Sequence, residues 1–134
     1  MAWWLLKTEP SAYSFDDLRR DRRTAWDGVT NPQAQANLRA MRRGDTVVVY
    51  HSGDKAAVGL GRVAGAPRPD PGDPTGKRVA VVVAAGKPLA VPVTLAALRE
   101  EEAFEGSALL RQGRLSVVGL TDRQGAVIVK LGRG

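Results

Sequence analysis

Short β-branched runs separated by glycine and proline dominate the second half of the chain and limit what it can fold into. The apolar runs cover residues 46–51, 57–64, 79–84 and 115–120, each about one strand long. Gly59 and Gly61 interrupt the second run, which predicts a bulge or a close backbone approach. Residues 65–77 hold four prolines and three glycines and predict a surface loop. We therefore expect a small, partly open β-barrel.

Helix signals lie between these runs. Ser14 precedes two aspartates and predicts the cap of a short helix. Asn31 followed by proline predicts a helix over 32–43, which Gly44 ends. Thr94 predicts the cap of a third helix. The tail is ambiguous, because Thr121 and Gln124 form a capping-box pattern whereas residues 127–129 favour a strand.

The positions of the three tryptophans indicate the environment of each ring. Trp3 and Trp4 lie in an apolar run, residues 3–7, that predicts the first strand. Because neighbouring side chains of a strand point to opposite faces, we expect one of them in the core and the other facing solvent or a cleft. Trp26 lies on a predicted loop beside Asp27, where its ring is placed either to stack on a planar ligand or to plug the barrel.

Length and composition exclude several classes of protein. A chain of 134 residues predicts one domain, residues 1–134, which can bury a core without further cross-links. With no cysteine and one histidine, disulfides, thiolate catalysis and cysteine-based or two-histidine zinc sites are excluded. No apolar run approaches the roughly 20 residues of a membrane span. The first ten residues lack a signal-peptide pattern, so we expect a cytoplasmic protein. From the composition we also expect no metal, no cofactor and no membrane partner.

Most of the net charge of +6 comes from one segment. Seven arginines and two aspartates lie between residues 19 and 43. A clustered basic face is typical of a polyanion partner. An arginine-rich surface selected for solubility or heat stability fits the charge equally well, so charge alone leaves both readings open.

No motif demands catalysis. The carboxylate runs at 16–17 and 100–102 fit solvated helix ends, and Ser52 beside His51 is not a triad without a third, orienting group. The nucleophile-elbow, P-loop and dinucleotide-binding glycine patterns are absent.

Nine short motifs occur in the order that is seen in the EVE domain family. They cover residues 4–10, 13–18, 26–34, 44–45, 50–52, 58–59, 69–71, 92–95 and 114–117. The chain resembles that family over essentially its whole length. The resemblance implies an α+β, mostly β fold: a PUA-like small open barrel of five or six strands with flanking short helices.

The resemblance also implies a function. It points to a non-enzymatic module that holds a modified base flipped out of DNA, such as 5-methylcytosine or 5-hydroxymethylcytosine, in an aromatic-lined pocket. Flipping costs a few kcal/mol, which stacking worth about 1–3 kcal/mol per base offsets. The alternatives are an RNA-binding module, a metabolite- or peptide-binding domain and a weakly catalytic nucleotide-processing domain. We expect DNA rather than RNA, and a monomer.

Candidate site residues follow from the motif positions. Trp26 would stack on the base or form a wall. Asp27 and Asn31 would supply hydrogen bonds or fix the loop, with Asn31 also capping the helix. Entrance residues would be Lys7, Thr8 and Glu9. The opposite wall would be Tyr50, His51 and Ser52. Candidate phosphate contacts are Arg22, Arg23, Arg42 and Arg43, for which an ordinary surface role fits equally well.

Five residues depart from the family pattern. Relatives often carry arginine at Thr30, an aromatic residue at Arg68, tryptophan at Arg78 and phenylalanine at Val48 and Val49. These departures predict a less aromatic barrel and leave the completeness of an aromatic cage open.

Overall fold

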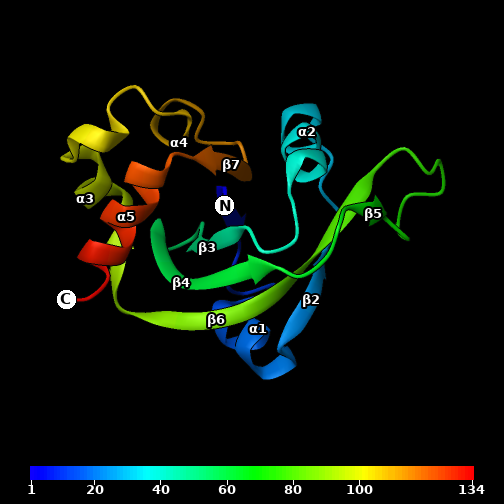
Figure 1. Ribbon diagram of the computed structural model, residues 1–134, viewed down its shortest axis with the longest axis horizontal. Helices are drawn as coiled ribbons and strands as arrows, with labels where there is room; N and C mark the ends of the chain where they lie inside the picture. The colour runs from blue at the N-terminus through cyan, green and yellow to red at the C-terminus, as the bar shows by residue number, and fades with distance from the viewer.

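Seven strands form one bent, open sheet in the computed structural model, which describes residues 1–134 (Figure 1). The strands are β1 (Trp3–Thr8), β2 (Arg23–Trp26), β3 (Thr46–His51), β4 (Ala56–Val63), β5 (Arg68–Pro69), β6 (Val79–Thr94) and β7 (Val117–Leu120). Their order is β2-β6-β4-β3-β1-β7, and the two-residue β5 pairs with β6. The main path therefore has six strands, and the expected mostly β, PUA-like open barrel is confirmed.

The first strand lies inside the sheet. β1 pairs in parallel with β3 on one side and antiparallel with β7 on the other. Its Leu5 and Leu6 are fully buried within a cluster of 25 hydrophobic residues. The start of the chain is thus held by strands 40 and more than 100 residues away, and only the completed sheet encloses this core.

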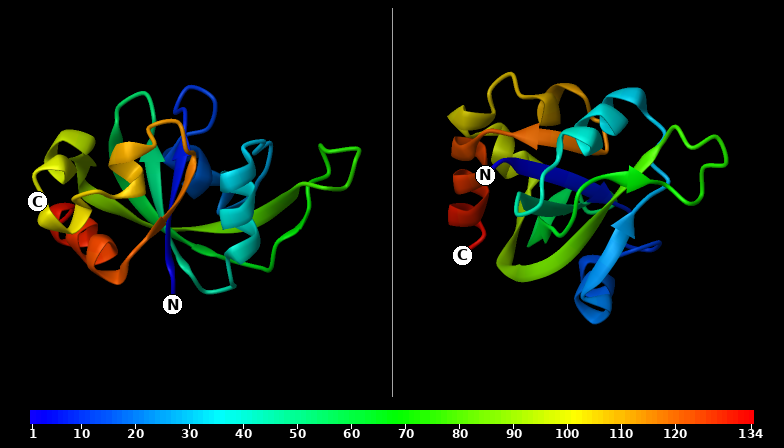
Figure 2. Two further views of the ribbon diagram at one scale, coloured as in Figure 1. Left: turned by 90° about the horizontal axis from the view of Figure 1, so that it is seen from above. Right: turned by 45° about the vertical axis from the view of Figure 1, so that its right-hand side comes forward.

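Short helices cover the sheet at its ends (Figure 2). They are α1 (Phe15–Asp21), α2 (Pro32–Ala40), α3 (Leu95–Arg99), α4 (Ala108–Arg111) and α5 (Asp122–Leu131), with a 3-10 turn, η1 (Glu102–Phe104). The caps expected at Ser14, Asn31 and Thr94 are confirmed. At the tail the Thr121–Gln124 capping box sets a helix, because α5 buries Ile128 completely on one face.

Helix α2 is shorter than expected. It ends at Ala40, and Met41 takes an extended conformation while its side chain is almost fully buried. Residues 42–45 then form a turn in which Asp45 accepts a hydrogen bond from the Arg42 backbone amide at 2.9 Å. Gly44, with φ +94°, belongs to this turn and does not end the helix.

Strand β6 is much longer than the expected run of residues 79–84. It continues to Thr94 through Gly86, Pro88 and Pro92, which interrupt the apolar pattern and lie where the pairing with β4 changes register. The predicted irregularity in β4 is confirmed, since its register against β6 shifts around Gly59 and Gly61. A Cβ atom at Gly61 would lie 2.6 Å from the Ala84 carbonyl oxygen, so the two backbones approach closely.

Neither N-terminal tryptophan is a core residue, so that expectation is wrong. Both side chains are half-buried. The Trp3 ring packs against α5 at Gly125, which has no side chain there. The Trp4 indole donates a hydrogen bond from Nε1 to Asp45 Oδ2 at 2.9 Å. Each face of β1 is therefore covered by a different neighbour.

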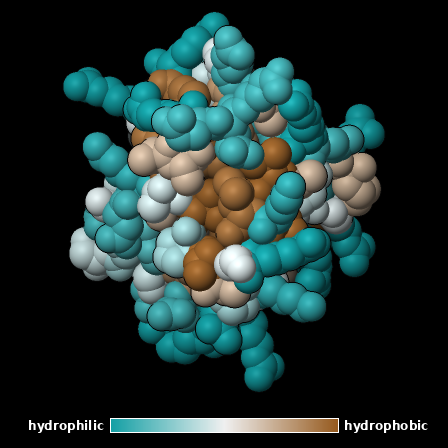
Figure 3. Space-filling model, turned by 90° about the vertical axis from the view of Figure 1, so that its left-hand side faces the viewer, coloured by the Kyte–Doolittle hydropathy of each residue, from teal (hydrophilic) through white to brown (hydrophobic).

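The two ends of the molecule differ. Helices α3 and α5 gather at one end, and the 65–77 loop extends from the other (Figure 2). The surface on the α3–α5 side shows an apolar area ringed by polar side chains (Figure 3), and Val91 is 41% exposed. No helix is both long and apolar enough to span a bilayer.

Candidate functional site

A cavity of about 380 Å³ opens beside the ends of β1 and β2. We call it the β1–β2 cavity. Its lining is Lys7, Thr8, Glu9, Tyr13, Thr24, Ala25, Trp26, Asp27, Gly28, Val29 and Ser116. The volume lies at the lower end of the range of small-molecule sites, roughly 300–1,000 Å³, which fits a single flat ring better than a large ligand.

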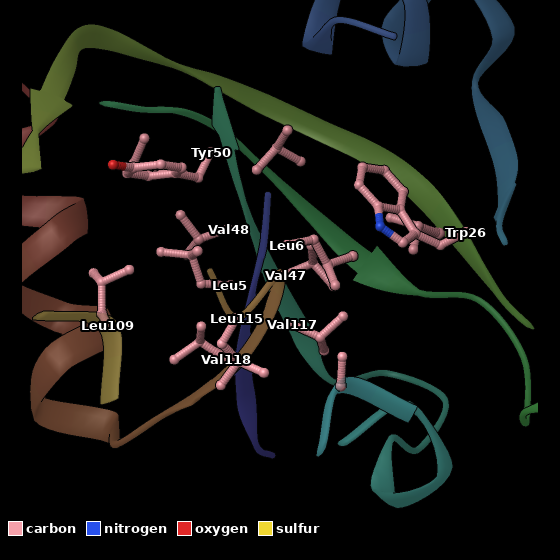
Figure 4. Packing of buried hydrophobic residues seen from close by; sticks show 14 of the residues in the cluster. Leu5, Leu6, Trp26, Val47, Val48, Tyr50, Leu109, Leu115, Val117 and Val118 are labelled. Atoms are coloured by element: carbon pink, nitrogen blue, oxygen red, sulfur yellow. The ribbon is translucent and has the colours of Figure 1, made fainter. Parts of the chain in front are cut away.

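Trp26 lies at the end of a strand, not on the expected loop. It is the last residue of β2 and pairs with Val81 of β6. Only 9% of it is exposed, so most of the ring packs in the core and a small part borders the cavity (Figure 4). The Tyr13 ring meets it edge-on, with centroids 6.5 Å apart and planes at 87°. The two rings form an aromatic corner of the cavity.

The rim after Trp26 is fixed by a residue from the distant 65–77 loop. Gly28, with φ +69°, donates its backbone amide to Asp70 Oδ2 at 2.9 Å. Asp70 is 4% exposed, and its other oxygen accepts from the Gly72 amide at 2.8 Å. A buried carboxylate with both oxygens engaged holds this turn in one conformation.

Buried Gln35 of α2 fixes the same rim from a second side. Its amide nitrogen donates to the Val29 carbonyl at 2.7 Å, and its amide oxygen accepts from Val79 of β6 at 2.9 Å. Asn31 caps α2 by accepting from the Ala34 amide at 3.0 Å. Asn31 therefore acts in fixing the loop, and it does not line the cavity.

Asp27 is the rim residue whose carboxylate stays free. Its side chain is exposed, and no protein group donates a hydrogen bond or an ion pair to it. A carboxylate is an acceptor only, so Asp27 offers ligands two unengaged acceptor oxygens.

The entrance residues of β1 are brought to the cavity as expected. Half-buried Lys7 donates from Nζ to the Gly113 carbonyl at 3.0 Å, and burial lowers its pKa. Thr8 donates from Oγ1 to the Tyr13 carbonyl at 2.7 Å. Tyr13 in turn donates its hydroxyl to Asp21 at 2.9 Å, and burial is the main reason that the pKa of Tyr13 is raised. The side chains of all three lining residues are therefore fixed by hydrogen bonds.

Tyr50, His51 and Ser52 do not form the opposite wall. Tyr50 is 3% exposed and lies across the core from Trp26 (Figure 4). His51 accepts at Nε2 from the Phe15 backbone amide at 3.0 Å and so anchors the start of α1. The Ser52 hydroxyl donates to the Thr8 carbonyl at 3.3 Å. Tyr50 thus packs in the core, His51 supports α1, and Ser52, just beyond β3, supports β1; none of the three lines the cavity.

The four candidate phosphate contacts lie in two places. Arg22 and Arg23 border a second hollow of about 370 Å³, together with Arg19, Arg62 and residues 84–86 of β6. We call it the arginine groove. Arg42 and Arg43 are exposed in the turn between α2 and β3 and border neither hollow.

Comparison with known proteins places this architecture in a family. A model of the EVE domain matches residues 2–131. The chain belongs to the EVE domain family. Among curated relatives, human thymocyte nuclear protein 1 is 40% identical over 63 residues, which cover 39% of this chain and 28% of that protein. The mouse protein is 38% identical over 81 residues, covering 51% and 36%. The matched segments thus span about a third of the length of these relatives.

Solved structures share the whole EVE fold. A Rhodopseudomonas palustris protein superposes with a TM-score of 0.93 at 41% identity, covering 98% of this chain and 93% of that one. The human THYN1 protein in complex with 5-methylcytosine-containing DNA has a TM-score of 0.88 at 27% identity, covering 100% and 99%. A YTH domain from MmI1, at 9% identity and a TM-score of 0.59, shares the fold alone.

The motif positions named some of the residues that line the β1–β2 cavity and missed the others. None of the five departures at residues 30, 48, 49, 68 and 78 lines the β1–β2 cavity. Tyr13, Gly28, Val29 and Ser116 lie within the quoted motifs but carried no assigned role. The sequence did not predict Thr24 and Ala25 as lining residues. The arginines before them hide the alternation of apolar and polar residues that marks a strand such as β2.

Proposed function

We propose that this EVE domain is a non-enzymatic nucleic-acid-binding module that holds a flipped 5-methylcytosine or 5-hydroxymethylcytosine in the β1–β2 cavity. The observation that carries the proposal is the pairing of an aromatic corner, Tyr13 and Trp26, with a free acceptor at Asp27. The likeness to the human protein solved with 5-methylcytosine-containing DNA supports it.

Each part of the cavity has a role in this proposal. The base plane packs against one ring of the corner and presents its edge to the other. Asp27 accepts from the exocyclic amine of cytosine, the pairing that carboxylates make with that base. Ala25 and Val29 supply apolar surface for the 5-substituent. Because Asp70 and Gln35 already fix the rim, binding orders little backbone.

The affinities follow from the chemistry. Burying one methyl group contributes about 0.8 kcal/mol, or roughly a fourfold preference for 5-methylcytosine over cytosine. Trp26 is largely enclosed, so stacking contributes toward the lower end of the usual 1–3 kcal/mol per base. We expect measurable discrimination of several-fold.

A binding role suits the titratable groups better than a catalytic one. The cavity holds the carboxylates of Glu9 and Asp27 but no histidine. His51 lies outside it and has Nε2 engaged by the Phe15 amide. A general base must reach the proton that it removes, and His51 does not reach this cavity.

Fluorescence anisotropy at fixed salt tests the proposal. Matched DNA probes carry cytosine, 5-methylcytosine, 5-hydroxymethylcytosine or N6-methyladenine, in duplex and single-stranded form, with RNA copies alongside. We expect one of the modified cytosines in DNA to bind several-fold tighter. Asp27→Asn replaces one acceptor oxygen by a donor and should weaken the binding of all the cytosine probes several-fold, whereas the exposed control Asp122→Asn should bind them as the wild type does.

Trp26 requires a conservative variant in the same assay. Trp26→Ala would cost about 3–5 kcal/mol of stability by leaving a void in the core, so Trp26→Phe is the better probe. Equal binding to all probes by the wild type, or an unchanged affinity of Asp27→Asn for the cytosine probes, would count against the proposal.

A further inference from the structure

The arginine groove lies at the other end of β2 from Trp26. Arg23 of β2 and Arg62 of β4 both pair with Ala84 of β6, which lies between them. Residues in register share a face of the sheet, so the two arginines flank a short side chain. Arg19 of α1 and Arg22, in the turn from α1 to β2 (Figure 1), complete the rim.

The groove holds positive charge without matching negative charge. Of the four arginines, only Arg19 has a carboxylate within ion-pair distance, Asp16 at 3.9 Å. The side chains of Arg22, Arg23 and Arg62 have no ion-pair partner and donate no hydrogen bond to the protein. Four guanidinium groups around one hollow repel one another, and an anion between them removes that repulsion.

Arg22 also takes a backbone conformation that arginine disfavours. Its φ is +68°, in the region that glycine adopts without strain. Two backbone hydrogen bonds fix it there, one to Leu18 at 2.7 Å and one from Ala85 at 2.9 Å. The fold thus holds this charged side chain at the groove where an uncharged glycine would suit the backbone better.

A third hollow extends the basic surface. It holds about 220 Å³ and is bordered by Arg23, Arg68, residues 64–66 and Val82. Arg23 borders both hollows, so they are neighbours. Along β2, three residue steps of about 3.3 Å place Arg23 roughly 10 Å from Trp26. One strand of a duplex carries a phosphate about every 3.4 Å along its axis, so this distance spans about three phosphates.

We propose that the arginine groove binds the phosphodiester backbone of the nucleic acid strand whose base enters the β1–β2 cavity, with Arg22 and Arg62 contacting phosphates about three nucleotides from that base. The path of the strand rests on the proposed function. The groove itself requires only a strand of linked phosphates, so the two proposals fail separately. Phosphate contacts position a strand and do not read its bases.

The test compares two double variants that lose the same charge. Arg22→Gln with Arg62→Gln removes the groove, and Arg111→Gln with Arg133→Gln removes two exposed arginines on α4 and at the C-terminus. Anisotropy is measured across a salt series with cytosine and 5-methylcytosine probes. We expect the groove variant to bind both probes about tenfold more weakly and its log–log salt slope to fall by about two. The ratio of the affinities for the two probes should change little in the groove variant. The control variant should bind both probes nearly as the wild type does. Circular dichroism confirms that all variants fold.

Each remaining outcome decides the matter. Equal losses in the two double variants would mean that only net charge matters and would overturn the groove. An unchanged salt slope in the groove variant would do the same. If the wild type binds both probes equally and the groove variant binds them more weakly, the result would support the groove and contradict the base pocket. Wild-type protein that binds no probe at low salt would overturn both. Release of the probe by millimolar inorganic phosphate at constant ionic strength, absent in the groove variant, would identify a free-phosphate site instead.

Discussion

At the scale of single residues, Arg22 places function and stability in opposition. Its φ of +68° costs an arginine about 1–2 kcal/mol that a glycine at a helix C-terminus does not lose. We expect Arg22→Gly to raise the free energy of unfolding by about 1 kcal/mol in urea titrations and to weaken oligonucleotide binding in the same preparation. A variant that is less stable than the wild type would show that the arginine side chain itself supports the fold.

Asp45 gives the protein a pH dependence. Burial by itself raises the pKa of this carboxyl, but hydrogen bonds from the Trp4 indole and the Arg42 and Ala2 amides outweigh it and lower the pKa. Its contribution to stability is therefore present above the unfolded value of about 3.9 and is lost as pH falls through the lower, folded value.

The corresponding variant is Asp45→Asn. It should lower the free energy of unfolding at pH 7 by about 1–3 kcal/mol, because a buried acceptor is lost. It should also lose less stability than the wild type between pH 5 and pH 2.5 in urea titrations. Parallel pH profiles for the two proteins would assign the acid sensitivity to other carboxylates.

At the scale of elements, α1 is held on the sheet by two contacts with its first residue. The Phe15 ring lies over Gly59 of β4, and the Phe15 amide donates to His51. A Cβ atom at Gly59 would overlap the ring, so Gly59→Ala should destabilise the protein by about 1–3 kcal/mol. Gly113→Ala meets open space and serves as the control. Equal unfolding midpoints for the two variants would show that α1 shifts freely.

The same scale separates what sequence reasoning could and could not predict. Helix starts at Ser14, Asn31 and Thr94 were predictable because each capping side chain and the backbone amide that donates to it lie three residues apart. Strand β2 and the second half of β6 could not be predicted. The first begins with an arginine and the second contains a glycine and two prolines, so only pairing with partners distant in the chain makes them strands. For the site, the motif at residues 50–52 was misleading. Its three residues are adjacent in the sequence, but Tyr50 packs in the core, His51 bonds to α1 and Ser52 bonds to the backbone of β1.

At the scale of the whole molecule, the 65–77 loop and the cavity rim act as one unit. Asp70 joins them across 42 residues by its hydrogen bond from Gly28. We expect Asp70→Asn to lower stability by about 1–3 kcal/mol and to weaken probe binding several-fold, because one of the two backbone amides that donate to this buried side chain loses its acceptor. Urea titration and anisotropy measure the two effects, with Asp122→Asn as control. If the variant is destabilised but binds the probe as tightly as the wild type, the conformation of the rim does not affect binding.

The inner position of β1 also sets the order in which the chain can complete its fold during synthesis. Strand β1 leaves the ribosome before both of its partners, because it needs residues 46–51 on one edge and residues 117–120 on the other. Until the last of these emerges, one edge of β1 offers unpaired backbone groups to any other strand. A nascent or truncated chain that stops before residue 117 therefore carries an open template for aggregation, which the four residues of β7 close.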